Sequence, residues 1–122
     1  MFFGALSGSI EHIRANKLRG LAVTTPSRLP ALPNTPSVSE FVPSYEASGW
    51  NGIGAPRALP AAIVERLNKE INAGLSDATI QGRLANLGVP VMLGSPAEFS
   101  RLIADEVEKW SKVVKFAGIK SD

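Results

Sequence analysis

The chain has 122 residues and a formal net charge of +2, and its 13 basic and 11 acidic residues are interspersed, so its charge predicts no nucleic-acid partner. A hydrophobic fraction of 44% is typical of a folded globular chain and excludes a disordered one. The absence of cysteine excludes disulfides and thiolate chemistry, and no apolar run reaches the roughly 18 residues that span a bilayer.

The first 25 residues predict a strand–helix–strand unit. Residues 1–3 are apolar and suit a short strand, and the β-rich run 18–25 suits a second one. Between them, apolar residues at helical spacing predict a helix over about residues 6–15, with Asn16 as its left-handed stop. Parallel strands in such units carry ligand-binding loops at their carboxyl ends. The apolar positions of the helix are Leu6, Ile10 and Ile13.

The interval from residue 26 to 43 is crowded with prolines, which predicts an extended surface connection with one turn over about residues 37–41. A stiff loop anchored by interleaved apolar residues is the favoured interpretation, and a proline-rich recognition peptide is the alternative. The prolines are Pro26, Pro30, Pro33, Pro36 and Pro43.

Residues 45–56 form an aromatic, glycine-spaced segment that predicts a strand crossing between two lobes. Gly49, Gly52 and Gly54 permit close backbone approach, and Trp50 offers a large packing surface. Such a strand suits a hinge.

Three helices and a short strand are predicted after the crossing segment. Pro60 opens a helix with an apolar face, and Asp77 caps a second helix that Gly88 ends. Residues 89–93 suit a short strand. Ser95 to Glu98 reads as a capping box that begins a long amphipathic helix, which Gly118 stops.

The motifs of enzymes are missing from the sequence. His12 is the single histidine, no nucleophile has a base and an orienting partner, and Gly49, Gly52 and Gly54 lack the spacing of a nucleotide-binding loop. We therefore expect a non-catalytic protein with no metal and no cofactor.

Several motifs in order resemble one family. Residues 12–25 read His-Ile-Arg-Ala-Asn-Lys-Leu-Arg-Gly-Leu-Ala-Val-Thr-Thr, and the match continues nearly to the end of the chain. The pattern closely resembles the Bug family, the TctC-type extracytoplasmic solute receptors of tripartite tricarboxylate transporters. Further matching residues are Arg28, Pro30, Leu32-Pro33, Thr35-Pro36, Tyr45-Glu46-Ala47, Trp50-Asn51-Gly52, Ala55-Pro56, the helix from Pro60, Leu84 to Gly88, Ser95 to Phe99, and Lys109-Trp110 to Gly118.

The resemblance implies an α/β fold that is part of a two-lobed periplasmic-binding-protein-like architecture, and it covers only the carboxyl-terminal portion of that architecture. Residues 1–48 would then form the end of the second lobe. Residues 49–122 would form the interlobe strand and the helices that complete the first lobe.

The implied function is capture of a small carboxylated solute in the periplasm and its delivery to membrane transporter subunits. The family's main glycine-rich carboxylate loops precede the part that this chain resembles, so we expect an incomplete cleft.

The part of the family's cleft that remains commonly reads Phe-Asp-Asn-Leu-Pro-Ser and aligns with residues 3–8. Gly4 and Ala5 replace the polar pair, which leaves backbone amides, Ser7 or Ser9 to contact a ligand, with an ordinary serine cap as the alternative. Trp50 is a further candidate at the cleft floor, with core packing as the alternative. The predicted ligand-binding residues are Gly4, Ala5, Ser7, Ser9 and Trp50.

A second hypothesis makes the chain a stand-alone interaction module. Apolar faces at Leu21, Val23 and the Trp50 segment would then be uncovered and would form a homo-oligomer. Localisation also has two interpretations: the resemblance implies the periplasm, whereas the first four residues lack the features of an export signal, which would leave the chain cytoplasmic as written.

Overall fold

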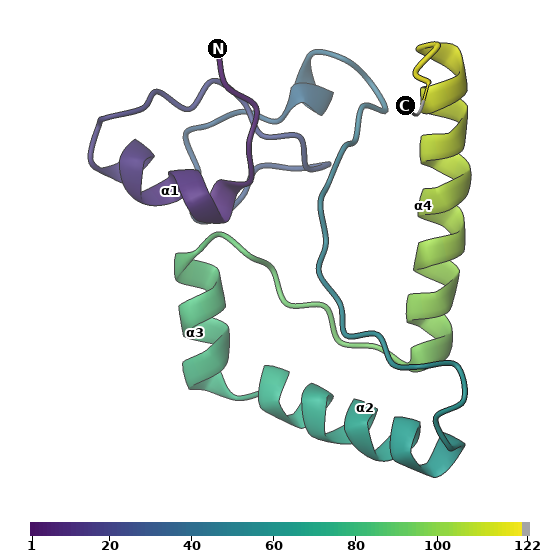
Figure 1. The fold of residues 1–122 in the computed structure, drawn as a ribbon. Helices are drawn as coiled ribbons and strands as arrows, with labels where there is room; N and C mark the ends of the chain where they lie inside the picture. Colours follow the sequence, from purple (N-terminus) through teal and green to yellow (C-terminus); the bar gives the residue numbers. More distant parts are fainter. Residues whose placement is uncertain (121–122) are drawn as a thin grey trace. The chain divides into compact units, whose positions relative to one another are not determined.

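The computed structural model describes residues 1–120, which form four α-helices and one short 3₁₀ helix (Figure 1). The helices agree with the sequence-based prediction in order and in approximate extent. Their bounds are α1 (Leu6–Arg14), η1 (Val38–Glu40), α2 (Ala61–Leu75), α3 (Ala78–Asn86) and α4 (Pro96–Phe116).

The helix starts at α3 and α4 follow the predicted capping chemistry. The Asp77 carboxylate accepts hydrogen bonds from the backbone amides of Thr79 and Ile80, at 2.9 and 3.0 Å. Ser95 and Glu98 form a complete capping box, in which Ser95 Oγ accepts from the Glu98 amide and Glu98 Oε2 accepts from the Ser95 amide. Those bonds lower the pKa of Glu98, because the Ser95 amide and hydroxyl stabilise its charged form.

The helix ends are also those that the sequence predicts. Asn16 follows α1 with φ of 56°, and Gly88 and Gly118 follow α3 and α4 with φ of 70° and 65°. A left-handed residue just past a helix lets backbone amides reach the last free carbonyls, and glycine and asparagine adopt that conformation at low cost.

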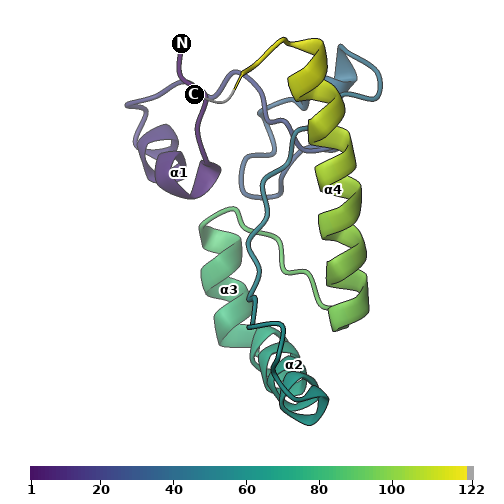
Figure 2. The same cartoon turned by 45° about the vertical axis from the view of Figure 1, so that its right-hand side comes forward.

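The predicted strands are not formed among residues 1–120. The backbone over residues 1–3, 18–25, 45–56 and 89–93 contains no named strand, and Figure 2 draws residues 45–56 as a coil from a second angle. One isolated parallel bridge joins Val23 to Ser37. A strand exists only when a neighbour completes its ladder of hydrogen bonds, and the described residues supply no second strand beside these segments. The α/β prediction is therefore wrong for this chain's own secondary structure, which is mostly helical.

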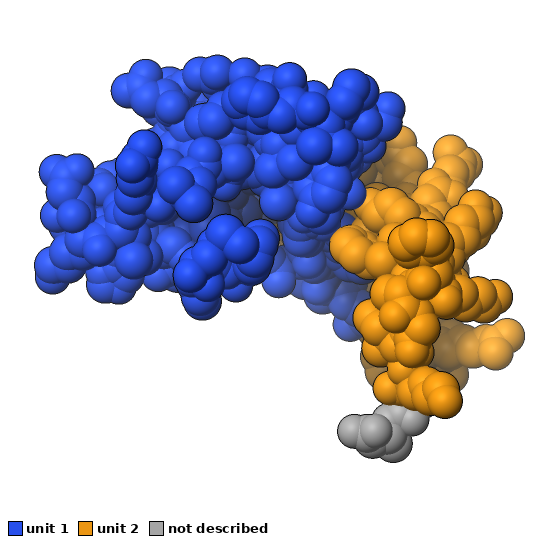
Figure 3. Space-filling model, turned by 90° about the horizontal axis from the view of Figure 1, so that it is seen from above, with its two compact units in different colours: residues 1–54, 75–91 blue, residues 55–74, 92–122 orange. Residues whose placement is uncertain are grey.

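Two compact units make up the chain (Figure 3). Unit 1 consists of Met1–Gly54 and Leu75–Val91, and unit 2 consists of Ala55–Gly74 and Met92–Asp122.

The core of unit 1 is small and is centred on α1. Ile10 has no exposed surface, and Val23 and Leu32 are the other buried apolar residues of the described chain. The end of α3 packs closely against α1, since a Cβ added to Gly88 would lie 2.5 Å from Leu6 Cδ2 and 3.3 Å from Ile10 Cδ1.

The proline-rich connection in unit 1 is tied down by polar contacts. Arg28 Nε and Nη2 donate to the two carboxylate oxygens of Glu40 at 2.8 and 2.7 Å, and Arg28 Nη1 donates to the Pro33 carbonyl. The Ser37 amide donates to Glu40 Oε1 at 2.8 Å, and Ser37 itself is fully buried. These contacts, together with buried Leu32, support the stiff-loop interpretation over the recognition peptide.

Acid should loosen this connection. The hydrogen bonds from Arg28 and from the Ser37 amide lower the pKa of Glu40 to about 2. Because this value lies below the unfolded-state value of about 4.3, the contact stabilises the fold fully above about pH 4.5 and is lost as the pH falls towards 2. We expect the Ser37 amide resonance in NMR spectra to shift through that window. Glu40→Gln should abolish the transition, and Glu46→Gln should leave it unchanged; an unchanged transition in Glu40→Gln would contradict this account.

Unit 2 contains α4 and nearly all of α2, and none of its described residues is buried. Both helices carry the apolar face that the sequence predicts, but many of the side chains on it remain substantially exposed. On these two helices the exposed large apolar residues are Ile63, Leu67, Ile103, Val107, Trp110, Val113, Val114 and Phe116.

Candidate functional site

Four of the five predicted ligand-binding residues lie around the start of α1. Ala5 is the N-cap, and no side chain caps this end of the helix. Ser7 is exposed in the first turn, and the Ser9 hydroxyl donates to the Ala5 carbonyl at 3.0 Å. The interpretation of these serines as an ordinary cap is therefore wrong. The uncapped amides of a first helical turn favour a negatively charged group.

Gly4 precedes this turn and lies against an aromatic ring. A Cβ at Gly4 would clash with the ring of Phe2, a residue that is itself 73% exposed. The glycine thus lets the Phe2 ring lie against the backbone just ahead of α1.

Trp50 lies on a different segment, the extended stretch that follows Gly49. Its side chain is 38% exposed, so it is partly covered and partly accessible. This exposure is intermediate between that of a packed core residue and that of a fully exposed surface residue.

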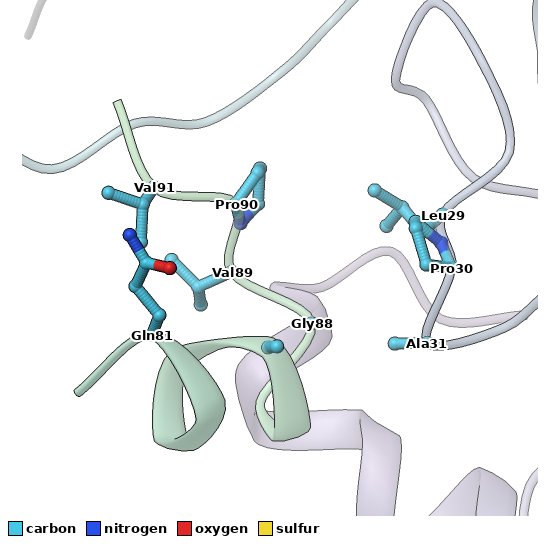
Figure 4. Close-up of a pocket in the computed structure, with 9 residues that line it drawn as sticks. Leu29, Pro30, Ala31, Gln81, Gly88, Val89, Pro90 and Val91 are labelled. Carbon is cyan, nitrogen blue, oxygen red and sulfur yellow. The ribbon is translucent and has the colours of Figure 1, made fainter. Parts of the chain in front are cut away.

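A separate cavity of about 390 Å³ lies in unit 1, between the proline-rich connection and the segment that follows α3 (Figure 4). Figure 4 shows Leu29 and Pro30 on one side, with Val89 and Pro90 on the other. Its single polar side chain is that of Gln81, so the lining offers no charge to a carboxylate. The cavity contains none of the five predicted residues. Its full lining is Leu29, Pro30, Ala31, Gln81, Ala85, Gly88, Val89, Pro90 and Val91.

This cavity is not among the sites predicted from the sequence. Each wall has a proline flanked by apolar residues, in Leu29-Pro30-Ala31 and in Val89-Pro90-Val91. This shared pattern can be seen in the sequence. The meeting of two segments so far apart in the chain, however, follows from tertiary packing and not from local spacing.

Within residues 1–120, no three metal-ligating side chains gather into a group, and His12 is exposed in the last turn of α1. None of the described helices combines the length and the apolar character needed to cross a membrane.

The fold matches part of the fold of solved periplasmic binding proteins. The structure matches the solved chain of R. palustris Rpa4515 with adipate at a TM-score of 0.85 and 38% sequence identity, over 93% of this chain and 38% of that chain. It matches the periplasmic binding protein BugD at a TM-score of 0.85 and 30% identity, over 93% of this chain and 39% of that one.

Residues 4–119 match the profile of the tripartite tricarboxylate transporter family receptor, TctC, and the chain belongs to this family. It is 32% identical to BugT of Bordetella pertussis over 112 residues, which cover 91% of this chain and 34% of BugT. The chain thus spans about a third of the length of the curated relatives it matches. The resemblance to the Bug family is confirmed, and a family of transport receptors agrees with the expectation of a non-catalytic protein.

Proposed function

We propose that this chain forms part of a two-lobed receptor that captures a small carboxylated solute in the periplasm and delivers it to the membrane subunits of a tripartite tricarboxylate transporter. One observation carries the proposal. The R. palustris relative, solved with the dicarboxylate adipate, shares 38% identity and the fold of this chain over 93% of its residues.

In this proposal residues 1–48 complete the second lobe, and residues 49–122 cross back and complete the first. The extended segment 45–56 would then pair in a sheet whose other strands come from the rest of the receptor. The segment is extended but belongs to no named strand among the described residues, and Trp50 is partly exposed. Both observations support this assignment, because an extended segment becomes a strand only beside a partner.

The exposed surface supports the same assignment. The chain exposes 9784 Å², whereas a compact monomer of its mass exposes about 6,300 Å². Even if each unit were a compact body on its own, the same relation gives only about 7,600 Å². The excess of about 2,000 Å² or more is the amount that permanent interfaces bury, so the chain exposes surface suited to packing against further structure.

We place part of the ligand contact at the start of α1, on Gly4, Ala5, Ser7 and Ser9, with Trp50 as a second contact. Backbone amides and hydroxyl groups can satisfy a carboxylate without a cationic side chain. In the isolated chain this contact is only a portion of a cleft, so we expect weak binding.

Isothermal titration of the 122-residue chain with adipate tests this expectation. We expect no saturable heat at ligand concentrations up to the millimolar range, with the R. palustris protein as the positive control. Micromolar binding by the isolated chain would contradict the incomplete cleft.

A second candidate function is a module that self-associates through its uncovered apolar faces, and the excess exposed area favours it as well. Light scattering across a range of chain concentrations distinguishes the self-associating module from the receptor part. A module of this kind gives a defined dimer or higher oligomer, and a strict monomer at high concentration rules it out.

A further inference from the structure

Unit 2 has no buried apolar core: none of its described residues is buried. Helices in globular proteins normally gain most of their stability from an apolar face packed against a neighbour. A polar contact can therefore contribute to fixing where α4 begins relative to α2.

Such a contact is present at Gly94, immediately before the N-cap of α4. Asn68 Nδ2 and Asn72 Nδ2 each donate to the Gly94 carbonyl at 2.9 Å. The Gly94 amide donates back to Asn72 Oδ1 at 3.2 Å. The two side chains are also joined, since Asn72 Nδ2 donates to Asn68 Oδ1 at 3.1 Å.

The chemistry of the carboxamide explains why asparagine occupies both positions. A carboxamide has two N–H donors and an oxygen acceptor, so Asn72 satisfies both the amide and the carbonyl of one residue, as a neighbouring strand would. The spacing of four residues places Asn68 and Asn72 on the same face of α2. Together they supply two donors to Gly94 O, and the four bonds form a closed network.

We propose that Asn68 and Asn72 form an amide clamp that fixes the start of α4 to α2, so that unit 2 keeps one arrangement of these helices while its apolar side chains are uncovered. This inference concerns unit 2 alone and does not depend on carboxylate binding.

The test compares the full chain with the double variant Asn68→Ala, Asn72→Ala. Alanine is the best helix former, so α2 itself is not weakened by the change. The chain has no cysteine, so Ala97→Cys provides a unique site on the first turn of α4 for a nitroxide label, which broadens the NMR signals of nearby amides.

In the parent chain we expect the label to broaden α2 amides around residue 72, and in the double variant we expect this broadening to disappear. The Gly94 amide should exchange with solvent about tenfold faster once its acceptor is removed. The single variant Asn72→Asp keeps the shape of the side chain but lacks the donors, and it should lose the broadening too. Asn86→Ala, on α3, is the matched control and should change neither signal.

Broadening and exchange that stay at parental values in the double variant would overturn the clamp. Retained broadening in Asn72→Asp would overturn the role of the carboxamide donors. Both readouts are independent of ligand binding, so a failure here is distinguishable from a failure of the receptor proposal.

Discussion

Replacing Ile10 by alanine should destabilise unit 1 by about 2–5 kcal/mol, the range for large-to-small changes at buried aliphatic positions. Ile10 is the only large apolar side chain of the described chain with no exposed surface. Its neighbours leave a cavity when the side chain is shortened, because they relax only partly. A natural domain has a total stability of only about 5–15 kcal/mol, so this single change should remove a large fraction of the stability of unit 1.

Urea denaturation followed by NMR signals of unit 1 measures the effect. Ile63→Ala on α2 is the matched control, since that isoleucine is 46% exposed, and it should cost less than about 1 kcal/mol. Equal losses at the two positions would mean that Ile10 does not occupy the core of unit 1.

Gly88→Ala is the second change with a large expected effect, at about 2–4 kcal/mol. Two causes contribute. The residue has φ of 70°, which costs an alanine about 1 kcal/mol or more, and the new Cβ would lie 2.5 Å from Leu6 Cδ2, which adds about 1–3 kcal/mol of overpacking.

Two other glycines separate these causes. Gly118→Ala has φ of 65° but meets no atom within 4 Å, so it should show the conformational cost alone. Gly82→Ala lies inside α3 with open space around it and should stabilise that helix by about 0.5–1 kcal/mol. Adding Leu6→Ala to Gly88→Ala should remove the part of the destabilisation that comes from the clash with Leu6. If Gly88→Ala cost no more than Gly118→Ala, the close packing of α3 against α1 would be wrong.

The helices could be predicted from the sequence because their signals are local. Asp77 and the Ser95–Glu98 pair bond to amides within three residues of themselves, and Asn16, Gly88 and Gly118 adopt positive φ where the sequence places a stop. Each signal acts within one turn of helix, so no distant residue is needed to interpret it.

The strands could not be predicted in the same way. The run 18–25 has the composition of a strand, yet only Val23 makes a bridge, and its partner is Ser37. Composition shows that a segment can become a strand, but a ladder depends on what lies beside it. The segment 45–56 also has the composition of a strand, yet it forms none among the described residues.

Part of the candidate site could be predicted from a contiguous motif, whereas other features depend on contacts between distant segments. The turn at Ala5 to Ser9 was indicated by resemblance to the family, because its motif is contiguous. The cavity between residues 29–31 and 89–91 and the contact of Asn68 and Asn72 with Gly94 both join segments that are separated in the sequence. The pattern of a single sequence does not show which distant segments lie close together in space.

The most direct test of the receptor proposal is adipate binding by a chimera. Residues 4–119 of this chain would replace the segment of the R. palustris protein that they match, and the corresponding segment of BugD would serve as the control graft. We predict that the chimera unfolds cooperatively and binds adipate or a related dicarboxylate saturably in the micromolar range. A chimera that folds but binds no tested dicarboxylate at millimolar concentration, or that fails to fold where the BugD graft folds, would contradict the assignment of this chain to a carboxylate receptor.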